Sequence, residues 1–203
     1  MLACAGLLWL AQAVLADRAS ELIAFASIKP GDKVADFMPD GGYFTRLFCK
    51  VVGDAGHVYV IGVPQLAVPS ASEVAGDCHN VTTSNLKSRL VPAPELHDDS
   101  DPGYVYEYWS SSPAAENFTA PEPLDVIWTS GNYHDLHSKA FGSPDMSRVN
   151  TALLAALKPG GLLLIEAHAV KQLRREVTEA GFEFAGELHD GADKRTVLKF
   201  RKP

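Results

Sequence analysis

An acid and two glycines mark the end of the first apolar run after the N-terminal segment. Asp36 stands near the end of residues 33–37, and Gly41 and Gly42 form a turn that opens an amphipathic stretch. Glycine backbone can approach a bound molecule closely, and a carboxylate at a strand end can accept hydrogen bonds from an amino group. The pattern predicts a nucleotide-like cofactor at Asp36, Gly41 and Gly42. The alternative is an ordinary tight turn with a capping carboxylate.

A second polar cluster follows the apolar run at residues 124–129. It reads Asn132-Tyr133-His134-Asp135-Leu136-His137. A histidine beside an acid can remove a proton from a reacting group, because the carboxylate orients the ring and stabilises its charged form. We assign His134 as a candidate catalytic base with Asp135 as the residue that orients it. Asn132 and Tyr133 are candidate residues of the cofactor pocket.

Two other interpretations of the histidines stay open. His134, His137 and His168, together with an acid, could bind a divalent metal ion, since imidazole is an ordinary ligand. Alternatively, His137 and His168 could be structural residues whose hydrogen bonds are satisfied at the ends of loops and strands. The chain has no Cys-x-x-Cys spacing, so a thiolate zinc site is not expected. We expect no metal.

Alternating strands and helices must position these residues. Apolar runs and turn signals predict strands at 33–37, 57–63, 104–109, 124–129, 162–167, 182–188 and 196–201, and helices at 20–28, 43–52, 84–90, 143–157 and 171–180. Parallel strands joined by crossover helices bring their carboxyl ends to one edge of a sheet. The order predicts an α/β, Rossmann-like fold: a seven-stranded, mostly parallel sheet, helices on both faces and one antiparallel strand near the C-terminus. Asp36, His134 and His168 should share one edge.

Composition limits the number of domains and the kind of partner. A chain of 203 residues, 46% of them hydrophobic, can bury one sizeable core. The formal net charge is -7 and the sequence pI about 5.4, so the chain lacks the basic face that phosphate backbones require. We expect a small-molecule partner and no nucleic acid. The sequence does not indicate the oligomeric state.

The N-terminus resembles an export signal. Residues 1–16 are uncharged and apolar and end in small residues that suit a cleavage site, which predicts a signal peptide before a domain at 17–203. The stretch is too short for a stable membrane span. We therefore expect a periplasmic or secreted protein. No Lys or Arg lies near Met1, so an uncleaved helix packed on a cytoplasmic domain is the alternative. In an oxidising compartment Cys49 and Cys78 could pair, or they could stay separate thiols.

Three segments resemble those of the class I S-adenosylmethionine-dependent methyltransferases, and within them a bacterial family of predicted, often signal-bearing methyltransferases. They are residues 34–45, 124–137 and 157–162. The stretch from Asn132 to His137 is the specific element, whereas Lys158-Pro159-Gly160-Gly161 before a strand is common to the superfamily. The resemblance implies S-adenosylmethionine as cofactor and methyl transfer to a small acceptor.

The chain also departs from the superfamily pattern. Met38 and Asp40 stand where glycines are usual, and Gly62 stands where an acid usually holds the ribose hydroxyls. The segment after His168 is shorter than in the relatives. A methyltransferase-like binding protein that has lost catalysis is therefore the alternative function.

Overall fold

A seven-stranded sheet forms the centre of the computed structural model, which describes residues 19–39, 41–66, 68, 70–92, 109–189 and 195–203. The strand order is β3-β2-β1-β6-β7-β9-β8. The strands are β1 (Lys33–Phe37), β2 (His57–Gly62), β3 (Val81–Asn85), β6 (Leu124–Ser130), β7 (Leu157–Ala167), β8 (Glu183–His189) and β9 (Thr196–Arg201). Neighbouring strands pair in parallel except at β9, which is antiparallel to both β7 and β8. The predicted fold class is confirmed.

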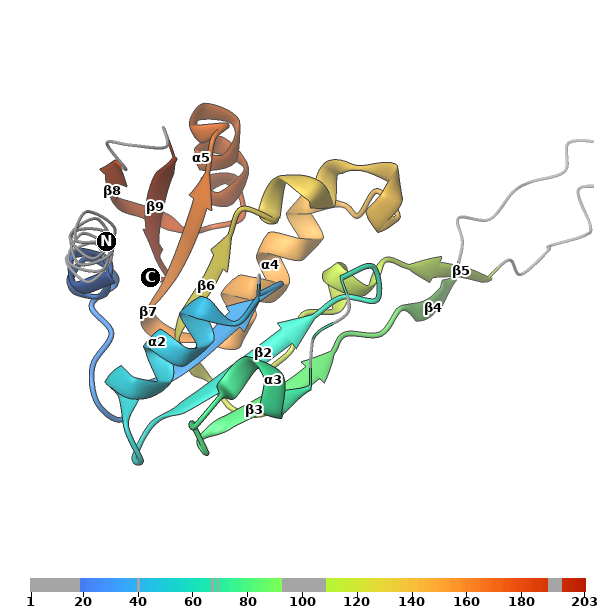
Figure 1. The fold of residues 1–203 in the computed structure, drawn as a ribbon. Coiled ribbons are helices and arrows are strands. Elements are labelled where there is room, and N and C mark those ends of the chain that lie inside the picture. Colours follow the sequence, from blue (N-terminus) through green and yellow to red (C-terminus); the bar gives the residue numbers. More distant parts are fainter. Residues whose placement is uncertain (1–18, 40, 67, 69, 93–108, 190–194) are drawn as a thin grey trace, which may run out of the picture.

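Helices cover both faces of this sheet (Figure 1). One face carries residues 19–26, α2 (Tyr43–Val52) and the short α3 (Ala71–Ala75); the other carries α4 (Met146–Ala156) and α5 (Val170–Glu179). Each layer has its own apolar cluster: Phe48 and Val52 belong to the first and Leu153 and Val177 to the second. The central strands are buried on both faces, as the continuous apolar runs of the sequence require.

Local signals explain where α4 begins. Asp145 is the N-cap, and its carboxylate accepts a hydrogen bond of 2.9 Å from the backbone N–H of Ser147. Val149 and Leu153 lie one turn apart and are both buried against the sheet. The predicted helix therefore forms, although it starts after the Ser143-Pro144 pair rather than at it.

The segment between β2 and β6 differs from the expectation. The third strand of the main sheet is β3, where Val81, Thr82 and Thr83 pair with β2, and the sequence analysis did not predict it. The helix predicted at 84–90 is wrong: β4 (Arg89–Pro92) pairs antiparallel with β5 (Trp109–Ser112) in a separate two-stranded sheet. The β-branched residues Val81, Thr82 and Thr83 favour a strand, and the edge of β2 offers it a partner. These two effects outweigh the weak helical periodicity of the segment that follows. Residues 104–108 lie outside the described residues.

Cys49 and Cys78 form a disulfide, with their Cα atoms 6.3 Å apart. The bond joins α2 to the connection between α3 and β3, so the pairing that the sequence left open does occur. None of the described helices has the length and apolar character needed to cross a membrane. Residues 1–18 lie outside the described residues, and the signal peptide stays a prediction.

Candidate functional site

The ends of β1 and β6 meet at the point where the strand order reverses. From β1 the chain moves outward through β2 and β3 and then returns to β6 on the other side of β1. Ligands of open α/β sheets bind at such a switch point, beyond the carboxyl ends of the strands. Here the two ends are joined directly, because the Asn132 side-chain N–H donates a 2.8 Å hydrogen bond to the carbonyl oxygen of Met38.

The turn after β1 has a glycine-type backbone even where glycine is absent. Met38, Gly41 and Gly42 have φ angles of 54°, 58° and 74°. For Met38 this left-handed conformation costs about 1–2 kcal/mol, which the surrounding structure must offset. The buried Met38 side chain and a 2.8 Å hydrogen bond from its N–H to the carbonyl of Ile61 hold it in place. The turn thus keeps the geometry that a glycine would give at this position.

The two predicted glycines have different surroundings. A Cβ atom on Gly41 would meet nothing within 4 Å, whereas one on Gly42 would lie 2.8 Å from both the Cα and the carbonyl oxygen of Val74. Arg46 fastens this contact through hydrogen bonds of 3.3 Å to the Gly41 carbonyl and 3.1 Å to the Val74 carbonyl. Gly42 is therefore required by the packing of α3 on the turn. Only Gly41 leaves open backbone for a ligand.

Asp36 lies beneath the turn and is 2% exposed. Its Oδ2 accepts a 2.5 Å hydrogen bond from the Thr45 hydroxyl in the first turn of α2. Burial raises the pKa of Asp36 to about 6, and the hydrogen bonds from Thr45 oppose this shift. No Lys or Arg in the described part of the chain pairs with this carboxylate. Its observed contacts are those of a turn-bonding acid.

Side chains of the protein fill the position of the usual ribose-binding acid. A Cβ atom on Gly62 would collide with Val68 and would lie 2.6 Å from Oδ1 of Asn85. Asn85 ends β3, the strand next to β2, and its side chain is exposed. A neutral amide from the neighbouring strand therefore occupies the place of the acid.

His134 and Asp135 lie on the 3-10 helix η2 (Tyr133–His137), directly after β6. The His134 Nε2 and the Asp135 Oδ1 are 3.0 Å apart, and the histidine side chain is 63% exposed. The expected pairing of this histidine with this acid is present. An exposed imidazole oriented by a carboxylate is accessible to an acceptor molecule.

The Tyr133 side chain is buried, and the residue is one of those that line the cavity beside His134. It is 1% exposed, and its hydroxyl donates a 2.9 Å hydrogen bond to Oδ1 of the buried Asn150 on α4. Burial raises the pKa of the Tyr133 phenol, so it stays neutral. The hydroxyl is thus engaged within the core, and the role of Tyr133 in a cofactor pocket stays a prediction. Asn132 is the neighbour that reaches the turn after β1.

A cavity of about 220 Å³ lies between η2, the end of β7 and α5, and His134, His137, Leu173 and Glu176 are among its lining residues. The His137 Nε2 lies 3.0 Å from Oε2 and 3.2 Å from Oε1 of Glu176, and its Nδ1 lies 3.3 Å from the His134 carbonyl. Both nitrogens of His137 thus face protein oxygens. His134 is the better placed of the two to take a proton from a ligand.

His168 follows the end of β7 at the same edge as Asp36 and His134, but it is exposed and has no hydrogen bond or ion pair with His134. In the described ranges, no three His, Cys, Asp or Glu side chains come together in a way that could hold a metal ion. The geometry therefore does not favour the metal interpretation of His134, His137 and His168.

The sequence analysis missed two acids. Glu166 is buried near the end of β7, accepts a hydrogen bond from the Ser130 hydroxyl and lies 3.5 Å from the Arg195 guanidinium. It is a single acid within an apolar strand, which is the signal that could have identified it. Glu176 lies on α5. Its position in the helix does not by itself distinguish it from the other charged residues of α5, which face solvent.

Comparisons with known proteins reveal the fold rather than a close relative. No family model matches the sequence, and no curated protein matches it. Among solved structures it is similar to a SAM-dependent methyltransferase from Aquifex aeolicus (TM-score 0.61, 16% identity, 91% of this chain and 89% of that one). It is also similar to N-methyltransferase NodS from Bradyrhizobium japonicum WM9 (TM-score 0.59, 13% identity, 92% and 95% covered). The fold is that of the class I SAM-dependent methyltransferases.

Proposed function

We propose that this protein is an S-adenosylmethionine-dependent methyltransferase that acts on a small-molecule acceptor. The main support is the hydrogen bond from Asn132 to Met38 at the switch point, next to three positive φ angles in the turn after β1. The chain keeps the backbone of a glycine-rich cofactor turn although Met38 replaces a glycine. A second structure of NodS, in complex with S-adenosylhomocysteine, has the same fold.

The residues present can accommodate the cofactor at three points. The open backbone at Gly41 would lie beside its amino-acid part, Asn132 would border it from β6, and the Asn85 amide could bond the ribose hydroxyls. Bound there, the cofactor supplies a methyl group activated by a sulfonium. His134 would take the proton that an acceptor loses, and Asp135 would orient the ring and stabilise its charged form.

A small acceptor fits the site better than a polynucleotide. The cavity beside His134 measures about 220 Å³, and the net charge of -7 opposes phosphate backbones. The fold neighbours include a fibrillarin from Methanococcus jannaschii described as a pre-rRNA processing protein (TM-score 0.52). A pre-rRNA substrate would not suit this acidic chain.

We also propose that the protein is exported to the periplasm or secreted. The uncharged, apolar residues 1–16 support a signal peptide. The disulfide between Cys49 and Cys78 supports an oxidising compartment, because cytosolic thiols are normally kept reduced.

One observation favours a second candidate, a binding protein without catalysis. The position of the ribose acid holds Val68 and the neutral Asn85, which favours weaker recognition of the cofactor. Such a binding protein would bind S-adenosylhomocysteine weakly and would transfer no methyl group.

The test is calorimetry of residues 17–203 with S-adenosylmethionine and S-adenosylhomocysteine. Gly41→Asn adds a side chain on the open side of the turn, and asparagine tolerates the positive φ. Gly160→Asn is the matched control, since Gly160 has a φ of 75° and open space and lies at the other end of β7. We expect Gly41→Asn to weaken binding at least about tenfold, a loss of about 1.4 kcal/mol, and Gly160→Asn to leave it unchanged.

Three outcomes decide between the candidates. No binding at millimolar cofactor, or binding indifferent to Gly41→Asn, removes the methyltransferase proposal. Binding that depends on Gly41, without methyl transfer to any acceptor in a broad panel of hydroxyl, thiol and amine compounds, favours the binding protein. Transfer that is lost in His134→Ala supports the enzyme.

A further inference from the structure

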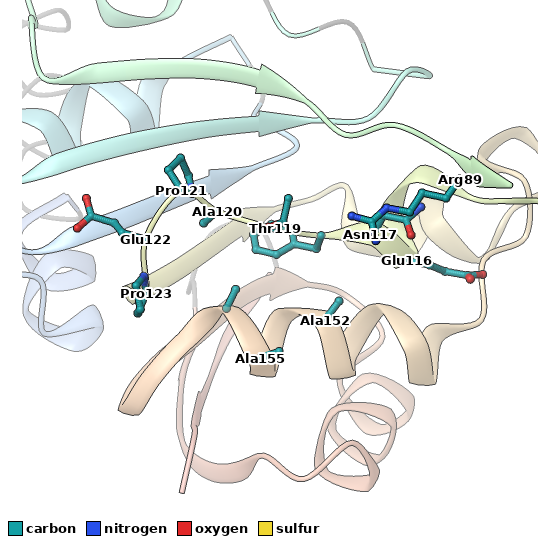
Figure 2. Close-up of a pocket in the computed structure, with 12 residues that line it drawn as sticks. Arg89, Glu116, Asn117, Thr119, Ala120, Pro121, Glu122, Pro123, Ala152 and Ala155 are labelled. Carbon is teal, nitrogen blue, oxygen red and sulfur yellow. The ribbon is translucent and has the colours of Figure 1, made fainter. Parts of the chain in front are cut away.

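A groove of about 520 Å³ runs along α4 (Figure 2). It shares no lining residue with the cavity beside His134. We call it the α4 groove, lined by Arg89, residues 116–123, Ala152, Ala155 and Ala156. Figure 2 shows Ala152 pointing from α4 toward the segment 116–123. The volume lies within the range of about 300–1,000 Å³ that is typical of small-molecule sites.

The groove exists because the crossover from β3 to β6 is unusual. In an ordinary α/β crossover a helix packs on the sheet beside its neighbour. Here the described part of the crossover contains the β4–β5 pair and a 3-10 turn, η1 (Ala114–Asn117), and no α-helix. Phe118 packs edge-on against Phe37 of β1, with ring centroids 5.0 Å apart, and fills the space nearest the sheet. The volume farther out, next to the alanines of α4, is left open.

The two acids of the groove are already bonded to other groups. Glu116 accepts a 2.9 Å hydrogen bond from the Asp145 N–H and lies 3.6 Å from the Arg148 guanidinium. Glu122 accepts a 2.5 Å hydrogen bond from the Tyr59 hydroxyl. Burial, and secondly this hydrogen bond, raise the pKa of the Tyr59 phenol to about 12. In Figure 2 both carboxylates point out of the groove. Each carboxylate also faces a cation, since Glu122 lies 3.8 Å from the Lys33 ammonium, so neither acid offers an unpaired negative charge to a ligand.

Arg89 is the remaining charge of the groove. No carboxylate within the described ranges pairs with its guanidinium, which Figure 2 shows beside Asn117 at one end of the groove. The Asn117 amide is held by hydrogen bonds of 3.1 Å to the Lys87 carbonyl and 3.0 Å to the Ser112 hydroxyl. The guanidinium therefore stands over a fixed surface at the end of an otherwise mostly neutral channel. A guanidinium binds carboxylate or phosphate through two parallel hydrogen bonds.

We propose that the α4 groove binds a soluble, amphipathic small-molecule anion. Its carboxylate or phosphate contacts Arg89, and its apolar body lies against Ala152 and Ala155. The positive charge at one end and the methyl groups along the floor complement these two parts of the ligand. The proposal does not depend on methyl transfer, because no residue of the groove belongs to the candidate site.

The probe is decanoate, added below its micelle-forming concentration to protein with ¹³C-labelled alanine methyl groups. We expect saturable shifts of the Ala152 and Ala155 methyl signals. Decanol, which has the same chain without the charge, should bind at least about tenfold more weakly, since a hydrogen bond to a charged group contributes about 1.5–3 kcal/mol. Decyltrimethylammonium should not bind, because its head group is positively charged, as Arg89 is.

Three variants complete the test. Arg89→Met should weaken decanoate binding at least about tenfold. Arg201→Met removes an exposed arginine at the end of β9 and should change nothing. Ala155→Met fills the groove at an exposed helical position and should abolish the shifts at Ala152.

Equal affinity for decanoate and decanol, indifference to Arg89→Met, or shifts confined to alanines outside the groove would each overturn the proposal. Calorimetry with S-adenosylhomocysteine should be unaffected by Arg89→Met. The two proposals can thus fail separately.

Discussion

The Asn132 amide nitrogen lies 2.8 Å from the Met38 carbonyl oxygen and so ties the loop after β6 to the turn after β1. The two residues are far apart in sequence but follow neighbouring parallel strands. This hydrogen bond fixes the backbone that a cofactor would contact. It makes Asn132 a positioning residue for the turn.

Replacement of Asn132 tests this role. We expect Asn132→Ala to lower the free energy of unfolding by about 1 kcal/mol, the usual net value of a hydrogen bond, and to weaken S-adenosylhomocysteine binding about tenfold. Asn80→Ala is the matched control, because the Asn80 amide donates an equivalent 2.8 Å bond to the Gly53 carbonyl away from the cleft. Urea denaturation and calorimetry measure the two effects. Equal cofactor affinity in both variants would contradict the role of Asn132.

The buried Asp36 should make stability depend on pH. Its pKa is about 6 in the folded protein, against an ordinary value of 3.8, so between these values the folded state binds more protons than the unfolded state. Stability should therefore fall as pH rises from about 4 to about 6 and stay lower above that window. Protonated Asp36 contributes at most about 3 kcal/mol to the free energy of unfolding below this window.

Asp36→Asn keeps an acceptor for the Thr45 hydroxyl but cannot ionise. We expect this variant to lose the decline in stability between pH 4 and pH 7, measured by denaturant unfolding at each pH. Asp77→Asn, which changes an exposed acid, should keep it. A wild-type protein that becomes more stable across this window, with the same slope in Asp36→Asn, would contradict the assignment.

Tyr133 should matter for stability and not for cofactor binding. Tyr133→Phe removes the donor that bonds Asn150 and leaves a buried amide oxygen without its partner, which costs about 1–3 kcal/mol. Tyr43→Phe, at an exposed site that opens α2, should cost little. Thermal unfolding distinguishes the two variants. A large loss of S-adenosylhomocysteine affinity in Tyr133→Phe would return this hydroxyl to the cofactor pocket.

The disulfide should stabilise the protein. It closes a loop with a sequence separation of 29 residues, for which the loss of chain entropy in the unfolded state corresponds to about 3–4 kcal/mol. We expect dithiothreitol to lower the unfolding midpoint of the wild type and to leave that of Cys49→Ser/Cys78→Ser unchanged. Intact mass before and after reduction shows whether the bond is present. A midpoint that reduction does not change would contradict the stabilising role.

The sequence by itself determined the fold class and the edge of the sheet where the candidate residues gather. Apolar runs, glycine turns and helical spacing are local signals, and strands joined by helices have few possible topologies. Asp36, His134 and His168 therefore lie at one edge, and the pairing of His134 with Asp135 depends only on adjacent residues. The local pattern failed between β2 and β6, because β3 forms by pairing with β2 and β4 by pairing with β5, whatever the weak helical periodicity of residues 84–90.

Only the tertiary structure decided what each residue contacts. It paired Cys49 with Cys78, placed Val74 against Gly42 while leaving Gly41 open, and turned Tyr133 toward Asn150. Each of these contacts joins residues from different elements, and their distance and direction depend on how helices pack on the sheet. Residue type and spacing limit which groups can do chemistry, but the packing of the layers decides which of them face a ligand and which serve the core.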